Sequence, residues 1–515
     1  METISSINDA INSLVWGVPM LIMIVGSGLF LTIGVKFLQF IRLPYIFRET
    51  IGKAFQKQET EEGSVSPLQA LTTALAATVG TGNIAGVAGA ITMGGPGAIF
   101  WMWLSALFGM ATKYAEVTLA IKFRERNENG DWVGGPMYYI KNGLGAKFRP
   151  LAVIFAVFAC LAAFGIGNMT QGNTIADSVY SAVASFQDEE DFTVEEVYEG
   201  DLLIRVDTYD KNQFLVESET FDAEGNSSTE TFKPPLEGTV RIIVGLVVTV
   251  LCAMVLLGGM KRIGAVTERL VPMMAGIYIL ACCFVILSNI GALGTVLASI
   301  FKGAFQPDAV LGGAVGITIA EAAKRGIGRG VFSNEAGLGS APIAHAAAQT
   351  DSPVKQGLYG VFEVFADTIV ICTLTALTIL CSGIHIDYGN SSAGGVDLTI
   401  AAFSESFPGQ MASVLVAIGL SLFAISTILS WGLYGTRCCE FLWGAKAAKI
   451  YQIVFVMFIT VGCTMNLELA WSIADTLNGL MAIPNLIAVL LLSGTVFALT
   501  KEHFSHGEFK GTSQK

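Results

Sequence analysis

The chain contains eleven apolar runs, each long enough to cross a lipid bilayer as a helix. A spanning helix needs about 20 mostly apolar residues, and a composition with 53% hydrophobic and 14% charged residues is typical of a membrane protein. The sequence therefore predicts an all-α polytopic membrane protein with helices near residues 14–40, 67–93, 98–123, 148–186, 238–258, 262–288, 309–346, 355–382, 409–434, 448–466 and 467–500.

Lysine and arginine residues indicate the orientation, because short cytoplasmic loops carry an excess of both. They cluster in alternate connections, the first of which contains Arg42, Arg48 and Lys53. All of these connections are cytoplasmic if the N-terminus lies outside. We expect a multi-pass protein of the cell's inner (plasma) membrane, surrounded by the lipid bilayer, with the N-terminus outside and the tail 501–515 in the cytoplasm.

The net charge of −12 arises mainly from one segment, residues 187–237, and therefore says nothing in favour of nucleic acid as a partner. Apolar and polar residues alternate in this segment around Asp210-Lys211-Asn212 and Gly225-Asn226. That pattern predicts a small strand-rich extracellular insertion with hairpin turns. Its acidic side chains could hold Ca²⁺, but a solvated surface is the simpler interpretation because the spacing of a calcium-binding loop is missing.

Sequence motifs for enzyme chemistry are lacking. The nine cysteines contain no CxxC pair and fit small apolar core residues. No nucleophile stands with a base, and no cluster has metal-ligand spacing. We therefore expect no enzyme activity and no cofactor.

The second apolar run is weakened in its middle by the sequence "VGTGN", which contains Gly80, Thr81, Gly82 and Asn83. Glycine in a helix interior costs about 1 kcal/mol relative to alanine. Unwound backbone is tolerated in a membrane only where it is buried in protein or lines a cavity. There, free N–H groups can hold a carboxylate and free carbonyl groups can hold Na⁺. The alternative is that the glycines only permit close helix crossing.

A second break occurs five helices later, in "GVFSNEAGLGSAP", Gly330 to Pro342. Secondary transporters often contain two inverted repeats with interrupted helices at equivalent positions. Two breaks at this spacing predict a five-plus-five inverted repeat preceded by one extra helix. The predicted units are residues 1–66 with the extra helix and a cytoplasmic connection, 67–186 and 238–288 for the first repeat on either side of the insertion, and 289–500 for the second repeat.

Three stretches together resemble one family: "ATVGTGNIAGVAGAITMGGPGAIFWMWLSALFGMATKYAEV", "GGPMYYI" and "GRGVFSNEAGLGSAPIAHAAA". They are similar to the alanine or glycine:cation symporters, which have a LeuT-type fold. The resemblance implies sodium-coupled symport of small neutral amino acids into the cell by alternating access, with alanine first, glycine second and Na⁺ as the coupling ion. The insertion is not a feature that we associate with this family.

The resemblance also implies a binding site. Backbone N–H groups of Thr81 and Gly82 would hold the substrate carboxylate. Ile428 stands where the related fold has a second sodium-binding hydroxyl, and Ser426 lies on another helix face. The implied substrate residues are Thr78, Thr81, Gly82, Asn83, Phe332, Ser333, Gly337, Thr427 and Trp431, and the implied sodium ligands are Ala76, Val79, Ala424 and Thr427.

The fourth apolar run is unusually polar. Phe164, Asn168 and Gln171 recur at helical spacing and are predicted to share one face. That face could line the substrate cavity, with an apolar wall and two polar contacts. Hydrogen bonding between helices is an equally good interpretation of each residue.

Ionisable residues inside apolar runs are costly and mark candidate functional sites. Glu335 could meet the substrate ammonium or a cation, or could pair structurally. His345 could relay protons, although a hydrogen-bonded packing role is favoured. A proton-coupled carrier using either residue is the main alternative function, followed by an amino acid sensor that uses the insertion. The other such residues are expected to pair within the bundle: Asp367 and Asp475 with neighbouring helices, and Glu116 with Lys113.

Overall fold

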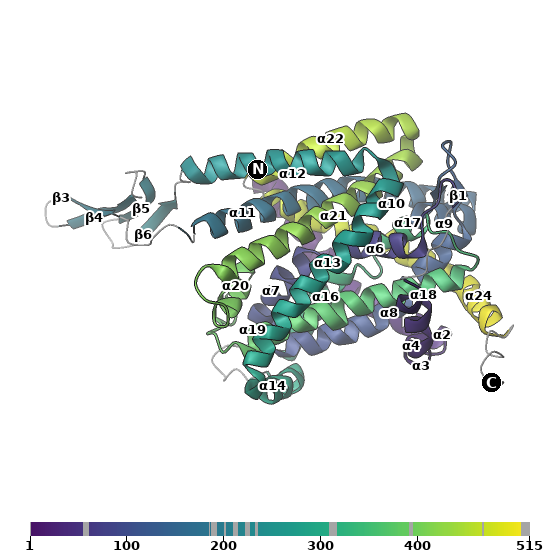
Figure 1. Ribbon diagram of the computed structural model, residues 1–515, viewed down its shortest axis with the longest axis horizontal. Coiled ribbons are helices and arrows are strands. Elements are labelled where there is room, and N and C mark those ends of the chain that lie inside the picture. The colour runs from purple at the N-terminus through teal and green to yellow at the C-terminus, as the bar shows by residue number, and fades with distance from the viewer. Residues whose placement is uncertain are drawn as a thin grey trace.

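The structure is a computed structural model that describes residues 2–54, 61–184, 186, 193–199, 202–209, 215–221, 227–231, 235–307, 317–390, 395–465 and 468–505. Helices form one elongated bundle, and a small β-sheet projects from one end of it (Figure 1). The short strands β1 (Glu125–Arg126) and β2 (Trp132–Val133) lie at the opposite end, near the C-terminus.

The helices of the first half begin with α1 (Glu2–Val15) and α2 (Val18–Gly34), followed by the short helices α3 (Leu38–Ile41), α4 (Leu43–Glu49) and α5 (Ile51–Ala54). The chain continues through α6 (Pro67–Thr78), η1 (Thr81–Asn83), α7 (Ala85–Gly94), α8 (Gly97–Lys122), α9 (Pro136–Tyr139), α10 (Arg149–Phe164), the π-helical turn η4 (Gly165–Met169), α11 (Thr170–Ala184), α12 (Pro235–Leu256) and α13 (Gly259–Ser288).

The second half contains α14 (Leu293–Phe305), α16 (Ile319–Asn334), α17 (Ala341–His345), α18 (Pro353–Val364), the π-helical segment η7 (Phe365–Cys372) and α19 (Thr373–Cys381). It ends with α20 (Val396–Ser404), α21 (Met411–Trp443), α22 (Ala445–Thr464), α23 (Glu468–Leu491) and α24 (Ser493–Ser505).

Eight helices in the described part of the chain are long and apolar enough to cross a membrane, and α6 with η1 and α7 makes a ninth if this pair, bent by 59°, is one span. The expected count of eleven is therefore not confirmed. The two predicted spans that do not meet the criterion are α8 and the interrupted α16–α17. The first span runs over Ser6–Gly34 rather than 14–40, because the chain turns at Lys36 and Phe37, which both have positive φ.

The first broken helix starts at a well-defined cap. Ser66 Oγ accepts a hydrogen bond from the Gln69 backbone N–H, and the Gln69 side chain accepts one from the Ser66 backbone. Just before this cap, Val65 pairs with Ala348 in a parallel bridge: Val65 N–H donates to Ala347 O over 3.0 Å, and Gln349 N–H donates to Val65 O over 2.8 Å. The bridge joins the start of the first broken helix to the chain beyond the second.

Helix α16 packs closely on α8 because glycine removes a side chain where the two helices cross. A Cβ atom built on Gly326 would lie 2.1 Å from the backbone oxygen of Ala98. Gly328, two residues further along α16, has open space at the same position.

Gly326→Ala is expected to lower thermal stability in detergent, with an overpacking cost of about 1–3 kcal/mol. The matched variant Gly328→Ala is expected to be neutral or slightly stabilising, because alanine favours a helix over glycine. The measurement is the melting temperature of both variants by differential scanning fluorimetry. Equal melting temperatures would mean that the crossing of α8 and α16 does not require Gly326.

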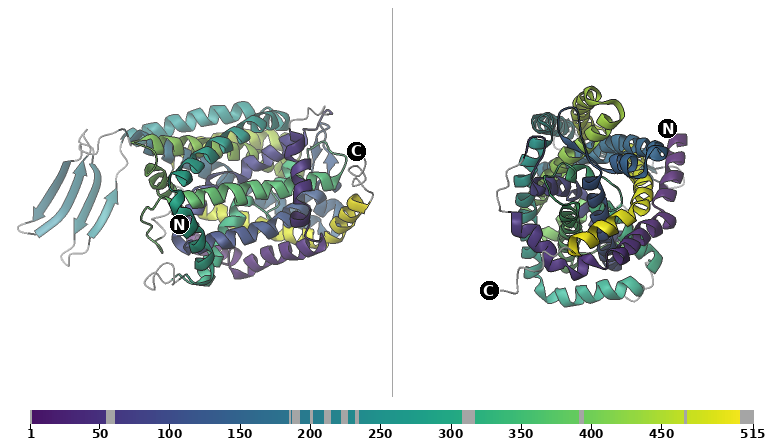
Figure 2. Two further views of the ribbon diagram at one scale, coloured as in Figure 1. Left: turned by 60° about the horizontal axis from the view of Figure 1, so that its bottom comes forward. Right: turned by 90° about the vertical axis from the view of Figure 1, so that its right-hand side faces the viewer.

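The insertion forms a four-stranded antiparallel sheet in the order β3-β4-β5-β6 (Figure 2). Its strands are β3 (Thr193–Glu199), β4 (Leu202–Tyr209), β5 (Leu215–Phe221) and β6 (Ser227–Thr231). The strands expected from the alternating sequence are present, whereas the two expected hairpin turns at 210–212 and 225–226 lie outside the described residues. The N-terminus lies toward the sheet end of the bundle and the C-terminus at the other end (Figure 2).

Candidate substrate and ion site

The first helix break lies where the sequence predicted it. After Thr78 the backbone leaves the helical conformation at Val79, with ψ of 90°, and at Gly80, with φ of −142° and ψ of −155°. The side-chain oxygen of Asn83 accepts a hydrogen bond from Gly80 N–H over 2.8 Å and so holds the unwound segment. A Cβ atom on Gly80 would lie 2.8 Å from Thr427 Oγ1, which brings α21 directly against the break.

The second break follows α16 and lies against the first. Glu335, Gly337 and Gly339 all have positive φ, of 54°, 96° and 81°, so the chain cannot continue as a helix until α17. A Cβ atom built on Gly82 would lie 3.3 Å from the ring of Phe332 and 3.7 Å from Ser333 Cα. The two unwound segments are therefore neighbours in the middle of the bundle.

Asp367 joins the two breaks. Its Oδ1 accepts a hydrogen bond from Asn83 Nδ2 over 2.6 Å, and its Oδ2 accepts bonds from Ser333 Oγ over 2.8 Å and Thr368 Oγ1 over 2.7 Å. Asn83 Nδ2 also lies 3.0 Å from Ser333 Oγ. All four side chains are buried. The expectation that Asp367 bonds to neighbouring helices is confirmed, and those neighbours are the two broken helices themselves.

Helix α21 contacts the first broken helix through hydroxyl groups. Ser426 Oγ donates to Ala76 O over 3.1 Å, and Ser430 Oγ donates to Thr73 O over 2.7 Å. Thr427 Oγ1 donates within its own helix, to Phe423 O over 3.0 Å, and also lies against Gly80. The sequence argument set Ser426 aside as lying on another helix face. That face nevertheless meets the first broken helix, at Ala76.

Trp431 and Glu335 meet in the interior. Trp431 is fully buried and its Nε1 donates to Glu335 Oε1 over 3.1 Å, while Ser340 Oγ donates to Glu335 Oε2. The π-helical turn η4 packs on the indole through Gly167, where an added Cβ would lie 2.1 Å from Trp431 Cβ. Glu335 therefore has donors on both oxygens.

The expected pair of Glu116 with Lys113 is replaced by other partners. Lys113 Nζ lies 3.2 Å from Glu363 Oε1, whereas Glu116 Oε1 accepts from Asn485 Nδ2. His345 is hydrogen-bonded on both ring nitrogens, as its expected packing role requires: Nε2 is 3.1 Å from Glu363 Oε2, and Nδ1 is 2.8 Å from Gln356 Nε2. The spacing of residues along α8 could not predict these contacts, because each partner lies on another helix.

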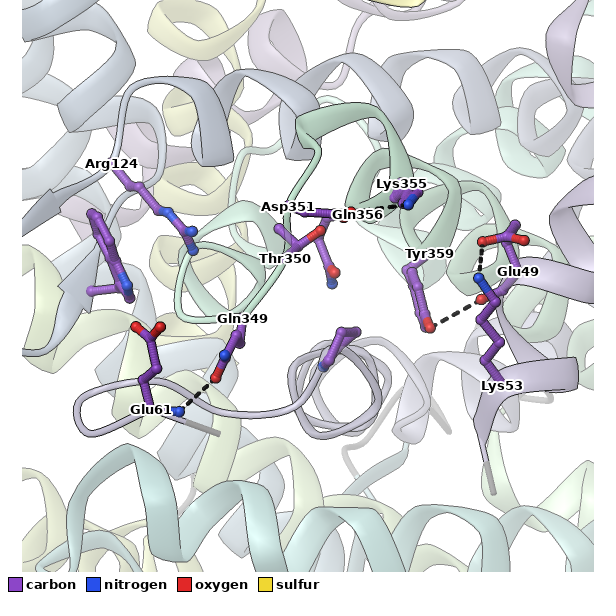
Figure 3. A pocket seen from close by; sticks show the side chains of 12 residues that line it. Glu49, Lys53, Glu61, Arg124, Gln349, Thr350, Asp351, Lys355, Gln356 and Tyr359 are labelled. Atoms are coloured by element: carbon purple, nitrogen blue, oxygen red, sulfur yellow. Dashed lines mark hydrogen bonds and ion pairs between the residues drawn. The ribbon is translucent and has the colours of Figure 1, made fainter. Parts of the chain in front are cut away.

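A cavity of about 590 Å³ opens beside the start of α6 (Figure 3). Its wall includes Gln356, Tyr359, whose hydroxyl donates to Glu49 O over 3.1 Å, and Gln349, whose side chain accepts from Glu61 N–H over 2.6 Å. Arg124 also lines it and donates to the carbonyl groups of Ala346 and Ala348 over 2.9 and 2.6 Å. Burial, with a smaller effect of the charge on Arg126, lowers the pKa of Arg124 to about 10, so it stays charged at neutral pH.

A family model described as the sodium:alanine symporter family matches residues 1–203 and 215–514. This chain belongs to that family. The match to the sodium:alanine symporters leaves out only residues 204–214 within the insertion. Most of the projecting sheet is thus part of the matched region, contrary to the expectation that the insertion is foreign to the family.

Named relatives point the same way. The sodium/alanine symporter AgcS of Methanococcus maripaludis is 44% identical over 97% of this chain and 97% of its own. The amino-acid carrier protein AlsT of Bacillus subtilis is 36% identical over 93% of this chain and 88% of its own. A crystal structure of MhsT in complex with L-phenylalanine, 14% identical, matches with a TM-score of 0.53 over 86% of this chain and 99% of that chain. The LeuT-type fold is confirmed for this sodium:alanine symporter family member.

The residues singled out in the fourth run make the contacts between helices that were one of their two expected roles. The Phe164 ring packs against Tyr451, Phe455 and Phe458 of α22, with centroids 5.0–5.5 Å apart. Asn168 Nδ2 donates to Phe455 O over 2.5 Å, and Gln171 Nε2 donates to Ile166 O over 3.0 Å. Their contacts are with α22 or within their own helix, and Gly167 is the residue that touches Trp431.

A second cavity, of about 340 Å³, reaches Phe332 from the side of α1. Arg329 lines it, with its guanidinium 5.7 Å from the centroid of the Phe332 ring. Asp475 also lines it and accepts from Asn12 Nδ2 over 3.0 Å, which confirms the expected bond of Asp475 to a neighbouring helix.

Proposed function

We propose that this protein is a sodium-coupled symporter that carries alanine, with glycine as a second substrate, into the cell. The observation that supports this best is the meeting of two unwound segments, joined by Asn83, Ser333 and Asp367, in the interior of a helical bundle. Unwound backbone at mid-membrane is where transporters of this architecture bind substrate and ions. Family membership and the printed names of the relatives support amino acid and Na⁺ as the cargo. Transport, rather than catalysis, is the proposed activity.

The proposed substrate site is the space around the two breaks. Backbone N–H groups of Thr81 and Gly82 lie in η1, just before α7 begins at Ala85, and the positive end of that helix dipole favours a carboxylate nearby. Asp367 is hydrogen-bonded to both breaks and is proposed to attract the substrate ammonium. Phe332 and Trp431 are the proposed walls, and together they favour a small side chain. Thr78, Asn83, Ser333 and Gly337 complete the proposed set.

Two amides of the fourth run remain in the proposed substrate set. The oxygens Asn168 Oδ1 and Gln171 Oε1 are buried and have no hydrogen-bond partner among the described residues. An unpaired buried acceptor is costly unless a ligand or water serves it. That supports a polar contact from these two residues, whereas Phe164 is assigned a packing role.

The proposed sodium site lies between α6 and α21. Carbonyl groups of Ala76, Val79 and Ala424 and the hydroxyl of Thr427 are the proposed ligands, since hard cations prefer oxygen. Ser426 is proposed as a positioning residue rather than a ligand, because its hydroxyl donates to the Ala76 carbonyl and so orients it. An ion shared by α6 and α21 would hold the two helices together and order the adjacent carboxylate site. Coupling is then the difference in substrate binding between the ion-loaded and ion-free states.

We further propose the plasma membrane as the location, with the N-terminus and the projecting sheet outside. The basic connections then lie in the cytoplasm, as the positive-inside rule requires. On this assignment the cavity of Figure 3, beside the start of α6, faces the cytoplasm.

The test is uptake of radiolabelled alanine into proteoliposomes under an inward Na⁺ gradient, with an inward pH gradient as the alternative driving force. Thr427→Val is expected to reduce Na⁺-driven uptake about 10- to 100-fold by removing one ligand, since each 1.4 kcal/mol is a factor of ten. The matched control is Thr436→Val, because the hydrogen bond that the structure describes for Thr436 stays within α21, to Gly432 O over 2.6 Å. Uptake driven by pH alone, unaffected by Thr427→Val, would favour the proton-coupled alternative.

A further inference from the structure

A group of buried charged residues lies beside the second break, apart from the proposed sodium and substrate ligands. Lys113 and Glu116 come from α8, Glu363 from α18, and Glu335 from the break itself. Each is at most 4% exposed. Lys113 is within electrostatic range of all three carboxyl groups. Three carboxylates around one ammonium would bury uncompensated negative charge, which costs several kcal/mol per ion.

The hydrogen-bond donors show which of the three carboxyl groups is least compensated. Glu335 receives donors on both oxygens, from Trp431 and Ser340. Glu363 does so too, from Lys113 and His345. Those four donors stabilise the ionised form of both acids. Glu116 differs, because Asn485 serves Oε1 while Oε2 is buried without a partner among the described residues.

We propose that Glu116 is a proton-binding site, occupied in this conformation, and that its proton exchanges with the cavity of Figure 3 through His345. A proton on Oε2 makes Glu116 neutral and removes most of the cost of leaving that oxygen unpaired. The proposal does not depend on which amino acid the protein carries.

A chain of hydrogen bonds runs from the cavity to Glu363 and Lys113. Gln356 lines the cavity, and its Nε2 donates to His345 Nδ1 over 2.8 Å. His345 Nε2 is then the protonated nitrogen that donates to Glu363 Oε2 over 3.1 Å. Lys113, which bonds Glu363 Oε1, lies one helical turn before Glu116. The chain therefore ends beside the proposed site.

His345 can pass a proton along this chain. Gln356 Oε1 has no partner in the part of the chain that the structure describes. Rotation of the Gln356 side chain lets a water of the cavity reach His345 Nδ1, which takes a proton from it, and Oε1 then accepts from the new N–H. The proton on Nε2 moves to Glu363 Oε2, which leaves a neutral imidazole in the other tautomer. Lys113 then passes a proton from Nζ to Glu116 and takes the proton of Glu363 in exchange, so that Lys113 and Glu363 regain their charges and Glu116 alone has gained a proton.

Glu116 is connected to the second break through Asn485, its side-chain donor, and through the backbone of Gly337. Asn485 Nδ2 also donates to Gly337 O over 2.8 Å, and Asn485 Oδ1 accepts from the Tyr139 hydroxyl. A movement of the break relative to α23 changes this bond and hence the affinity of Glu116 for its proton. The other titratable groups facing the cluster are Tyr139 of α9 and Tyr434 of α21. Proton binding and the conformation of the break are therefore linked.

The test is infrared spectroscopy of the purified protein in detergent at neutral pH. Wild type is expected to show the carbonyl band of a buried protonated carboxylic acid, with the small shift that deuteration produces. The band should disappear in Glu116→Gln, which keeps the shape of the neutral acid, and persist in Glu128→Gln, which changes an exposed glutamate. Absence of the band from wild type, or its persistence in Glu116→Gln, would overturn the proposal.

Two further variants keep the test decisive if Glu116→Gln fails to fold. Glu116→Asp retains a carboxyl group and is expected to shift the band in frequency, whereas an unshifted band would assign the proton to another acid. His345→Gln removes the relay and is expected to slow deuterium exchange of the band about 100-fold, the usual size of a general acid–base contribution. Unchanged exchange in His345→Gln would exclude the proposed route. No substrate or gradient is used, so failure here is distinct from failure of Na⁺-driven uptake.

Discussion

Replacing Asn83 with alanine is expected to reduce transport about 100-fold, because it leaves two buried groups unpaired at roughly 1–3 kcal/mol each. Gly80 N–H loses its acceptor and Asp367 Oδ1 loses its donor, so both the shape of the first break and its connection to the second are lost. The measurement is the initial rate of alanine uptake into proteoliposomes at saturating Na⁺, corrected for the amount of folded protein.

The matched control is Asn173→Ala in α11. Asn173 is also a polar residue in a spanning helix, but its one hydrogen bond among the described residues is long, at 3.5 Å to Met465 O. Its removal is expected to leave the uptake rate within about twofold, as for a surface substitution of less than 0.5 kcal/mol. If both variants transport equally well, Asn83 does not organise the site.

Lys113→Met is expected to be the most destabilising single substitution in the bundle, at about 3–5 kcal/mol, because it leaves the buried Glu363 carboxylate without its cation. The measurement is a denaturant titration in detergent micelles, compared with Lys141→Met. Lys141 pairs with Glu125 on the surface at 3.0 Å. An exposed pair of that kind contributes about 0–1 kcal/mol, so the control should unfold almost as wild type does.

A double variant shows whether the loss of charge or the loss of packing causes this destabilisation. Lys113→Met combined with Glu363→Gln removes both charges of the pair, and the amide introduced by the second change can still bond His345. Stability is expected to recover in large part, since removing both partners of a buried pair costs far less than removing one. A double variant as unstable as Lys113→Met alone would assign the effect to packing around the lysine side chain.

The two breaks could be predicted because their signals are local. Small residues around Gly80 and around Gly337 weaken a helix wherever it is placed, and the structure unwinds at both. These predictions needed only the conformational preferences of neighbouring residues and a regular helix.

Phe164 and Asn168 share a face, as expected, and both meet Phe455 of α22, whereas Gln171 donates a hydrogen bond within its own helix. The predicted common face for all three assumed 3.6 residues per turn, but residues Gly165–Met169 form the π-helical turn η4, which shifts the register of everything beyond it. Sequence periodicity does not reveal such a turn. Asp367 lies in a second one, η7, and its position between the breaks was hidden in the same way.

The buried ion pair could not be predicted from spacing either. Lys113 and Glu363 are 250 positions apart, and the sequence offered Glu116, three residues from Lys113, as the obvious partner. Only the packing of α18 on α8 selects Glu363. A lysine within an apolar run predicts that a partner exists, but the tertiary structure decides which acid it is.

The parallel bridge between Val65 and Ala348 limits how the protein can open at the cavity of Figure 3. If α6 swings away from α17, the bonds from Val65 N–H to Ala347 O and from Gln349 N–H to Val65 O must break together. Both bonds join main-chain atoms, so they can form whatever side chains stand at those positions. Arg124 donates to the neighbouring carbonyl groups of Ala346 and Ala348 and so holds the same stretch of chain in place. Opening there therefore requires that two main-chain bonds break while the cation just beyond α8 still holds the carbonyl groups on either side of Ala347.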